Sequence, residues 1–250
     1  MTALKEVCIL IVAVVGFGSI ANAAADKPSI VLVHGAFADG SSWSKIIPIL
    51  ERDGYYVTAV QIPLTSLADD IATTQSVLDA QKGAVVVVGH SYGGAVITGA
   101  AAGKKNVKSL VYVAAFAPDD NEPIAAVGSK FPAPPLNASL VPDSAGFLYV
   151  DRAKFHENFC GDVPPAEARI MAVSQKPLAG SAFGASVPVA AWKSIPTWYI
   201  VSKNDRAINP DVERFYAKRA NAKTTEIVSS HVPFLSHPSE VAKVIENAAR

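Results

Sequence analysis

The sequence is poor in cysteine and has no excess of charge of either sign. Its 250 residues include two cysteines, Cys8 and Cys160. Cys8 lies in an apolar N-terminal segment, and the single cysteine after it cannot close an intramolecular disulfide. Basic and acidic residues both number 22, and no run of like charge occurs. This balance gives no sign of a basic surface for nucleic acid, so we expect no nucleic-acid partner.

The spacings that hold metal ions and dinucleotides are also missing. No two of the five histidines stand in an H-x-x-x-H arrangement, and the cysteines do not form a metal-binding pair. No G-x-G-x-x-G pattern follows the first predicted strand. We therefore expect neither a metal nor a cofactor, and any chemistry has to come from side chains.

A long apolar run occurs at the N-terminus. There Lys5 precedes an apolar run from Val7 to Ile20, which ends in Ala21-Asn22-Ala23. This order predicts a secretory signal peptide over residues 1–23, cleaved after Ala23 or, in a second register, after Ala25. A membrane anchor or a buried first helix is the alternative, but the run is shorter than the roughly 20 residues that span a bilayer. We expect a secreted or periplasmic protein with no membrane partner after cleavage.

The rest of the chain, residues 24–250, has the length of one domain in which short apolar segments alternate with helical ones. Near-continuous β-branched runs are typical of parallel strands that are covered on both faces. The alternation predicts an α/β fold with a doubly wound, mostly parallel six-stranded sheet and right-handed crossovers. The expected strands are residues 29–35, 55–61, 84–90, 107–116, 196–202 and 223–230, and the expected helices are 42–53, 67–81, 91–103, 209–220 and 238–249.

The interval from about residue 117 to 195 breaks this alternation. It lacks a clear strand and contains proline-rich stretches such as "FPAPPLNASLVP". An interval of this length between two sheet strands indicates an insertion. A disordered spacer is the alternative, but aromatic side chains such as Phe155, Phe159 and Phe183 can bury apolar area. We therefore expect an inserted lid over an apolar pocket.

One short segment combines a serine with flanking glycines. Gly89-His90-Ser91-Tyr92-Gly93 fits G-x-S-x-G and stands between a predicted strand and a predicted helix, the context of a nucleophile elbow. Such a turn places Ser91 at the carboxyl edge of the sheet, where ligands bind in these folds. The Tyr92 backbone N–H then points toward an oxyanion. A second donor is expected in the first loop, "HGAFADG", from Ala36, with Phe37 as the alternative.

A serine nucleophile needs a histidine base, and the base needs an acid that orients it. His231 directly follows the last predicted strand, where a loop can bring it over Ser91. Asp205 follows the preceding strand and gives the chain order Ser, Asp, His. The alternatives are His237 for the base and, for the acid, Asp119 or Asp120.

With these motifs the chain resembles the α/β-hydrolases, and within them the group of methyl-ester esterases and hydroxynitrile lyases. The matching segments occur in order and cover nearly all of the chain outside the signal and the lid: "LVHGAFADGSSWSKIIPIL", "VVGHSYGG", "LVYVAAFAPDD", "SKNDRAINP" and "SHVPFLSHP". The resemblance implies a six-stranded core, a triad of Ser91, Asp205 and His231, and an oxyanion hole from the Ala36 and Tyr92 N–H groups. The lid does not match well, which leaves the substrate open.

Two positions separate the activities within this group. The lyases resemble one another in a threonine after the first-loop histidine and a lysine after the catalytic histidine, where this chain has Gly35 and Val232. Without that cation, hydrolysis is favoured over release of cyanide. We expect an exported serine hydrolase that cleaves small, largely apolar carboxylic esters through an acyl-serine. The alternatives are a hydroxynitrile lyase-like or haloperoxidase-like activity on the same triad, or a noncatalytic ligand-binding homologue.

Overall fold

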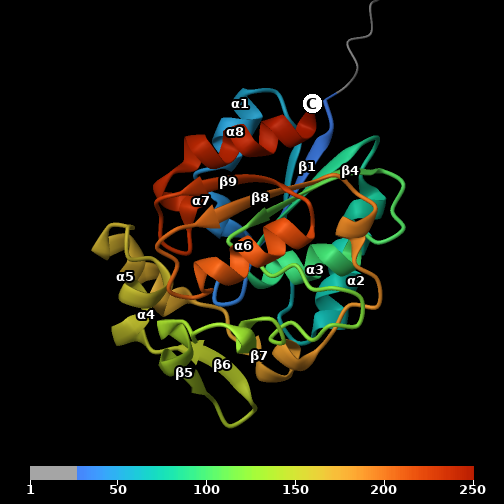
Figure 1. Ribbon diagram of the computed structural model, residues 1–250. Helices are drawn as coiled ribbons and strands as arrows, with labels where there is room; N and C mark the ends of the chain where they lie inside the picture. Colours follow the sequence, from blue (N-terminus) through green and yellow to red (C-terminus); the bar gives the residue numbers. More distant parts are fainter. Residues whose placement is uncertain (1–26) are drawn as a thin grey trace, which may run out of the picture.

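A computed structural model describes residues 27–250 of the chain (Figure 1). The predicted signal peptide, residues 1–23, lies outside the described residues, and so does Cys8. Within the described part, none of the helices is both long and apolar enough to cross a membrane.

Six parallel strands form the central sheet in the order β2-β1-β3-β4-β8-β9. This confirms the predicted fold class, and each strand lies within its predicted range. The order reverses between β1 and β3, so the loops that follow these two strands open on either side of a switch point, where ligands bind in such sheets. The strand bounds are β1 Ser29–Val33, β2 Val57–Val60, β3 Val85–His90, β4 Val107–Val113, β8 Thr197–Ser202 and β9 Lys223–Ile227.

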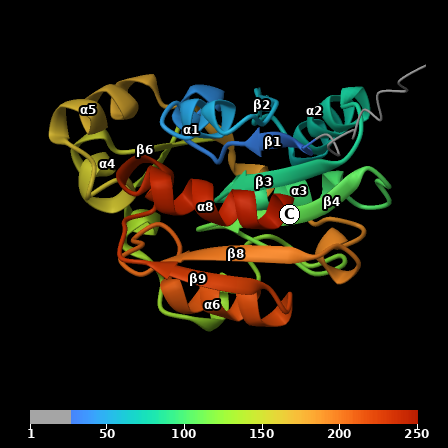
Figure 2. The same cartoon turned by 90° about the horizontal axis from the view of Figure 1, so that it is seen from above.

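Helices cover both faces of the sheet. Figure 1 shows α1 (Ile47–Arg52) and α8 (Pro238–Ala249) above it, and α2 (Leu67–Ala80), α3 (Tyr92–Ala100) and α6 (Pro210–Arg219) below it. From above, α8 lies across the sheet (Figure 2), and it contacts β3, β4 and β8. Every residue of α3 is buried, because this glycine- and alanine-rich helix packs between the sheet and α2.

The prediction of one helix over residues 42–53 is wrong. The structure has a 3₁₀ turn, Gly40–Trp43, and then the separate helix α1, which begins at Ile47. Pro48 explains the break. Because proline has no backbone N–H, it is tolerated in the first turn of a helix but interrupts one that has already begun.

The expectation that residues 117–195 lack a clear strand is also wrong. Between β4 and β8 the chain forms a three-stranded antiparallel sheet with two helices, α4 (Arg152–Phe159) and α5 (Pro165–Ser174). Its strands are short and partly exposed, so they lack the apolar runs of the main sheet. They are β5 Leu140–Pro142, β6 Phe147–Val150 and β7 Leu178–Ala179. We call residues 117–195 the lid.

The lid packs through aromatic side chains of α4. Phe155 and Phe159 are both buried, with ring centroids 4.9 Å apart. The Phe159 ring also lies 6.3 Å from that of Phe37, in the loop after β1, and 5.1 Å from that of His231, in the loop after β9. The lid therefore covers the carboxyl ends of the strands; in Figure 2, α4, α5 and β6 lie together at the left of the sheet.

Candidate active site

Ser91 occupies the sharp turn between β3 and α3. Its φ of +52° and ψ of −123° lie in a region that side-chain-bearing residues rarely adopt. Three backbone hydrogen bonds hold the turn: the Ser91 N–H donates to Val113 at 3.2 Å, and the Ser91 carbonyl accepts from Gly94 at 3.0 Å and from Phe116 at 3.1 Å. This is the geometry of a nucleophile elbow, as predicted from G-x-S-x-G.

The loop after β1 packs directly against this turn. A Cβ atom on Gly93 would lie 2.5 Å from the carbonyl oxygen of His34, and one on Gly35 would lie 2.8 Å from the Cβ of Ser91. Both distances are shorter than a nonbonded contact allows, so only glycine permits this approach. The glycines therefore bring the backbone of the first loop next to the serine.

Residues whose backbone N–H groups are unpaired in the described part of the chain line the same cavity as Ser91. Tyr92 is the first residue of α3, so its N–H has no acceptor within the helix and lies at the positive end of the helix dipole. The predicted donors Ala36 and Tyr92, and the alternative Phe37, all line one cavity with Ser91. Among the hydrogen bonds of residues 27–250, none uses the N–H of Ala36 or of Tyr92. Both groups are therefore available to a ligand.

His231 and Asp205 form a buried pair in the loops after β9 and β8. The His231 Nδ1–H donates to the Asp205 Oδ2 at 2.5 Å, and both side chains have an exposed fraction of 1% or less. The other carboxylate oxygen accepts the N–H groups of Ala207 at 2.6 Å and Ile208 at 2.9 Å. Because Nδ1 is engaged by the carboxylate, Nε2 is the ring nitrogen left to take up a proton.

Two further histidines support this arrangement and stay neutral. The His90 Nε2–H donates to the carbonyl oxygen of His231 at 2.9 Å, and complete burial lowers the pKa of His90 well below its ordinary value. His34 donates from Nδ1 to the Gly35 carbonyl at 2.8 Å and accepts the Ile62 N–H at Nε2. Burial lowers the pKa of His34 to about 4. Both rings are therefore structural.

The alternative acid and base residues lie elsewhere. Asp119 and Asp120 both pair with Lys193, and Asp120 also accepts the Ala190 N–H at 2.6 Å. The ring of His237 bonds to the neighbouring Ser236 hydroxyl at 3.0 Å. None of the three lines the cavity, whereas Ser91 and His231 both do. The structure therefore brings Ser91, His231 and Asp205 together and leaves these alternatives outside.

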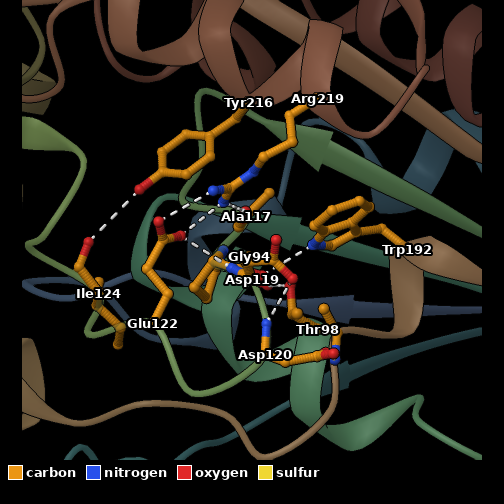
Figure 3. A network of polar contacts seen from close by, with 12 residues as sticks. Gly94, Thr98, Ala117, Asp119, Asp120, Glu122, Ile124, Trp192, Tyr216 and Arg219 are labelled. Carbon is orange, nitrogen blue, oxygen red and sulfur yellow. Dashed lines mark hydrogen bonds and ion pairs between the residues drawn. The ribbon is translucent and has the colours of Figure 1, made fainter.

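Asp119 and Asp120 belong instead to a polar network at the base of the lid (Figure 3). The Arg219 guanidinium on α6 bonds to both carboxylate oxygens of Glu122, at 3.0 and 2.7 Å, and to the Ala117 carbonyl at 2.6 Å. It also lies 5.4 Å from the ring of Trp192. The network thus ties the first residues of the lid to its last ones and to α6.

Two lid contacts hold the loops that carry His231 and Asp205, and sequence reasoning missed both. Asp162 accepts the Ser230 N–H at 2.9 Å and also the Ser230 hydroxyl, directly before His231. Leu136 donates its N–H to the Arg206 carbonyl at 2.9 Å, directly after Asp205. The partners lie some 70 residues apart in the sequence, and no local pattern indicates such pairings.

The cavity at Ser91 is narrow and largely apolar, with a volume of about 50 Å³. Its polar side chains are Ser91, His231, Tyr92, whose hydroxyl donates to Asp70, and, from the lid, the exposed Asn137. All of its lining residues are described by the structure, and none is lysine or arginine. The lining consists of Ala36, Phe37, Ser91, Tyr92, Phe116, Leu136, Asn137, Leu140, Phe159, Phe183, Ala207, Ile208 and His231.

Comparison with known proteins agrees with this geometry. The model of the alpha/beta hydrolase family matches residues 30–244, from β1 into α8. The chain belongs to this family. This confirms the predicted resemblance to the α/β-hydrolases. The relatives of the chain include methylesterases, as expected.

Two relatives and one solved structure illustrate the match. A pyrethroid hydrolase of Sphingobium wenxiniae is 29% identical over 248 residues, 88% of this alpha/beta hydrolase and 87% of that protein. Methylesterase 8 of Arabidopsis thaliana is 28% identical over 214 residues, 76% of each chain. The crystal structure of polyneuridine aldehyde esterase has a TM-score of 0.77 at 20% identity and covers 90% of this chain and all of that one. That last likeness shows the fold alone.

Proposed function

We propose that this protein is an exported serine hydrolase that cleaves small, largely apolar carboxylic esters. The observation that carries the proposal is the buried His231–Asp205 pair, at 2.5 Å, on the same cavity as the strained Ser91. A serine, a histidine and an acid in this order perform acyl transfer on many folds. The family match and the esterase relatives support hydrolysis as the reaction.

In the first half-reaction, Ser91 becomes acylated. His231 Nε2 takes the hydroxyl proton while the Ser91 Oγ bonds to the ester carbonyl carbon. The N–H groups of Ala36 and Tyr92 stabilise the resulting oxyanion, and Asp205 stabilises the imidazolium. The tetrahedral intermediate then breaks its bond to the alcohol oxygen, which receives the proton from His231 as it leaves.

In the second half-reaction, water regenerates the serine. His231 removes a proton from water, whose oxygen bonds to the acyl carbon and forms a second oxyanion on the same N–H groups. The bond between Ser91 Oγ and the acyl carbon breaks, and His231 returns the proton to Oγ. The acid is released, and the three residues are back in their starting state.

The lining of the cavity supports an apolar substrate. Small-molecule sites are mostly apolar, with a few polar groups that fix orientation. Here the lid contributes Phe159, Phe183 and two leucines, and the cavity contains no cation that would favour an anionic substrate. Its small volume favours short acyl or aryl groups over long chains.

The two positions that separate the activities of the group weigh against a hydroxynitrile lyase-like reaction. That reaction needs a cation to stabilise departing cyanide, and the position after His231 holds Val232, which is buried with 1% of its surface exposed. Gly35, after the first-loop histidine, offers no side-chain hydroxyl. Hydrolysis is therefore the reaction that these residues support best.

The export part of the proposal rests on the N-terminal sequence. Lys5, the apolar run and Ala21-Asn22-Ala23 have the order of a signal peptide. N-terminal sequencing of the secreted protein is expected to begin at Ala24 or Asp26. Recovery of the protein in the cytoplasm with Met1 intact would contradict it.

The mechanism is tested with Ser91→Ala. Hydrolysis of p-nitrophenyl acetate and butyrate should fall by about 10⁶-fold in turnover, because removing such a nucleophile removes the covalent route. A fluorophosphonate probe should label the wild type and not the variant. Ser144→Ala, an exposed serine in a lid turn, is the matched control. Activity that survives in Ser91→Ala excludes the mechanism, and a wild type that takes no label favours a noncatalytic homologue.

A further inference from the structure

A glutamate that the proposed reaction does not use is completely buried behind the site. Glu213, on α6, has an exposed fraction of 0%. Its Oε2 accepts the N–H of Ser202, the last residue of β8, at 2.9 Å. Its Oε1 is buried and has no hydrogen-bond partner among the described residues. A buried carboxyl oxygen without a partner is costly, unless it carries a proton and donates it.

Among residues 27–250, no cation forms an ion pair with Glu213, and the charge of Arg214 is the weakest of the influences on its pKa. Its neighbour Arg214 forms ion pairs with Glu226 of β9 and Asp211 of α6. The remaining titratable groups around Glu213 are two buried tyrosines, whose pKa values burial raises, and the carboxyl and imidazole groups of the site. These groups are Tyr199 of β8, Tyr216 of α6, Asp205 in the loop between them and, beyond Asp205, His231. The Tyr199 hydroxyl donates to the Ala115 carbonyl and so does not serve Glu213.

The acid of the site, Asp205, lies beside Glu213 and can accept a proton from it. The Asp205 N–H donates to the Ser202 carbonyl at 3.1 Å and the Ser202 N–H donates to Glu213 at 2.9 Å, so both acids belong to the same turn, where the Asp205 carboxyl group raises the pKa of Glu213. Two adjacent buried carboxyl groups do not both ionise. Asp205 receives hydrogen bonds from His231 and from two backbone N–H groups, whereas Glu213 receives one. Asp205 therefore holds the charge, and Glu213 holds the proton.

We propose that Glu213 is a positioning residue: as a neutral acid it donates an Oε1–H hydrogen bond to the Asp205 carboxylate and so holds Asp205 toward His231. This inference rests on the proposed function, in which His231 is the base and Asp205 its acid. Burial, and then the charge of Asp205, raise the pKa of Glu213 well above its ordinary value, in agreement with a neutral side chain. His231, on the cavity, thus bonds to Asp205, which in turn accepts from Glu213 in the core.

The protonation of Glu213 is tested without reference to activity. The titration of the His231 ring is followed by NMR in the wild type, Glu213→Gln and Glu213→Leu, with His231→Ala to assign the signal. Glutamine is uncharged, and its amide can both donate and accept a hydrogen bond. In Glu213→Gln the midpoint of the His231 titration should therefore stay within about 0.3 pH units of the wild-type value. If Glu213 is ionised, the same substitution removes a negative charge behind Asp205 and lowers the midpoint by about one unit or more. That result would overturn the proposal.

Glu213→Leu removes the donor and leaves the Asp205 charge less stabilised. The carboxylate should then hold the imidazolium proton more tightly, so the His231 midpoint should rise by about half a unit or more. Infrared difference spectra of Glu213→Gln against the wild type, at neutral pH, should show the loss of a protonated carboxylic acid. A spectrum that shows the loss of a carboxylate instead also overturns the proposal.

Kinetics add a second, independent readout. Glu213→Gln should keep kcat within about threefold of the wild type, whereas Glu213→Leu should lower kcat about tenfold or more with little change in KM, because only the orientation of His231 suffers. Equal losses in both variants would contradict the positioning role. Labelling of Ser91 in the wild type by a fluorophosphonate separates this failure from failure of the proposed function, because it shows an activated serine whether or not Glu213 carries a proton.

Discussion

Asp162 in the lid accepts both the backbone N–H and the hydroxyl of Ser230, the residue directly before His231. The lid therefore does more than cover the cavity, because one of its loops also fixes the backbone next to His231, the proposed base. Through Leu136 and Arg206 it holds the loop of Asp205 in the same way.

Asp162→Ala should loosen this support. The Ser230 N–H loses its acceptor, so the free energy of unfolding should fall by about 1–3 kcal/mol. We expect kcat for p-nitrophenyl butyrate to fall roughly tenfold, because a displaced His231 is a poorer base. Urea unfolding and steady-state kinetics measure the two effects. Glu51→Ala, an exposed acid on α1, is the control, and an unchanged kcat in Asp162→Ala would show that the lid does not align His231.

Asp205→Asn should lose about 10⁴-fold in turnover, because an amide cannot hold the Nδ1–H tautomer of His231 or stabilise its imidazolium. Asp119→Asn and Asp120→Asn should keep most of their activity, since both carboxylates pair with Lys193 at the base of the lid. Hydrolysis of p-nitrophenyl acetate compares the three variants. The opposite ranking would move the acid to the loop after β4.

His34 should make the fold sensitive to acid. Burial lowers the pKa of His34 from 6.5 to about 4. Between these pH values, His34 is protonated in the unfolded chain but neutral in the folded chain. Unfolding then takes up a proton, and stability falls as the pH falls from 6.5 toward 4, by roughly 3 kcal/mol for this ring.

Urea unfolding at several pH values in this window measures the slope. His34→Gln can donate to the Gly35 carbonyl and accept the Ile62 N–H without titrating, so its stability should depend less on pH. His237→Gln, whose ring is reached by solvent, is the control. A slope that His34→Gln leaves unchanged would mean that His34 does not cause it.

The cavity should limit the length of the acyl chain. We expect short-to-medium acyl or aryl esters to be hydrolysed faster than long-chain triglycerides, and peptide amides to be poor substrates, because the apolar space at Ser91 is narrow. A series of p-nitrophenyl esters, with methyl salicylate and a peptide amide included, measures the preference. A maximum at the longest chains, or a preference for the amide, would contradict this interpretation of the cavity.

Phe183→Ala tests whether the lid sets that limit. Phe183 lines the cavity from the lid, so its truncation should move the optimum toward longer acyl chains. Phe215→Ala, on α6 outside the cavity, should leave the optimum in place.

The parts of this fold that the sequence predicts are those that depend on patterns of consecutive residues. The buried central strands β1 and β3 are runs of mostly β-branched side chains, and the turn at Ser91 needs only the five residues from Gly89 to Gly93. Asp205 and His231 follow from their places after β8 and β9, because parallel strands present their carboxyl ends at one edge.

The parts that it does not predict depend on distant partners. β5, β6 and β7 pair with one another, and each is too short to show a periodic pattern. The bond between Asp162 and Ser230 joins residues 68 positions apart. The burial of Glu213 could have been inferred from the sequence, because Tyr216 and Ala217 follow it by three and four residues and so share its buried helix face.

In the network of Figure 3, Arg219 bonds to Glu122 and lies beside Trp192. Asp120, at the edge of this network, bonds in addition to Ala190 and Lys193, so the two ends of the lid are joined. The first and last residues of the inserted segment thus lie side by side where it joins the sheet domain, and we call this junction the neck. Such a segment can be exchanged between related enzymes as one block, with the neck as the point of crossover. The incoming block would have to bring its own equivalents of Asp162 and Leu136, so substrate range and alignment of the base are inherited together.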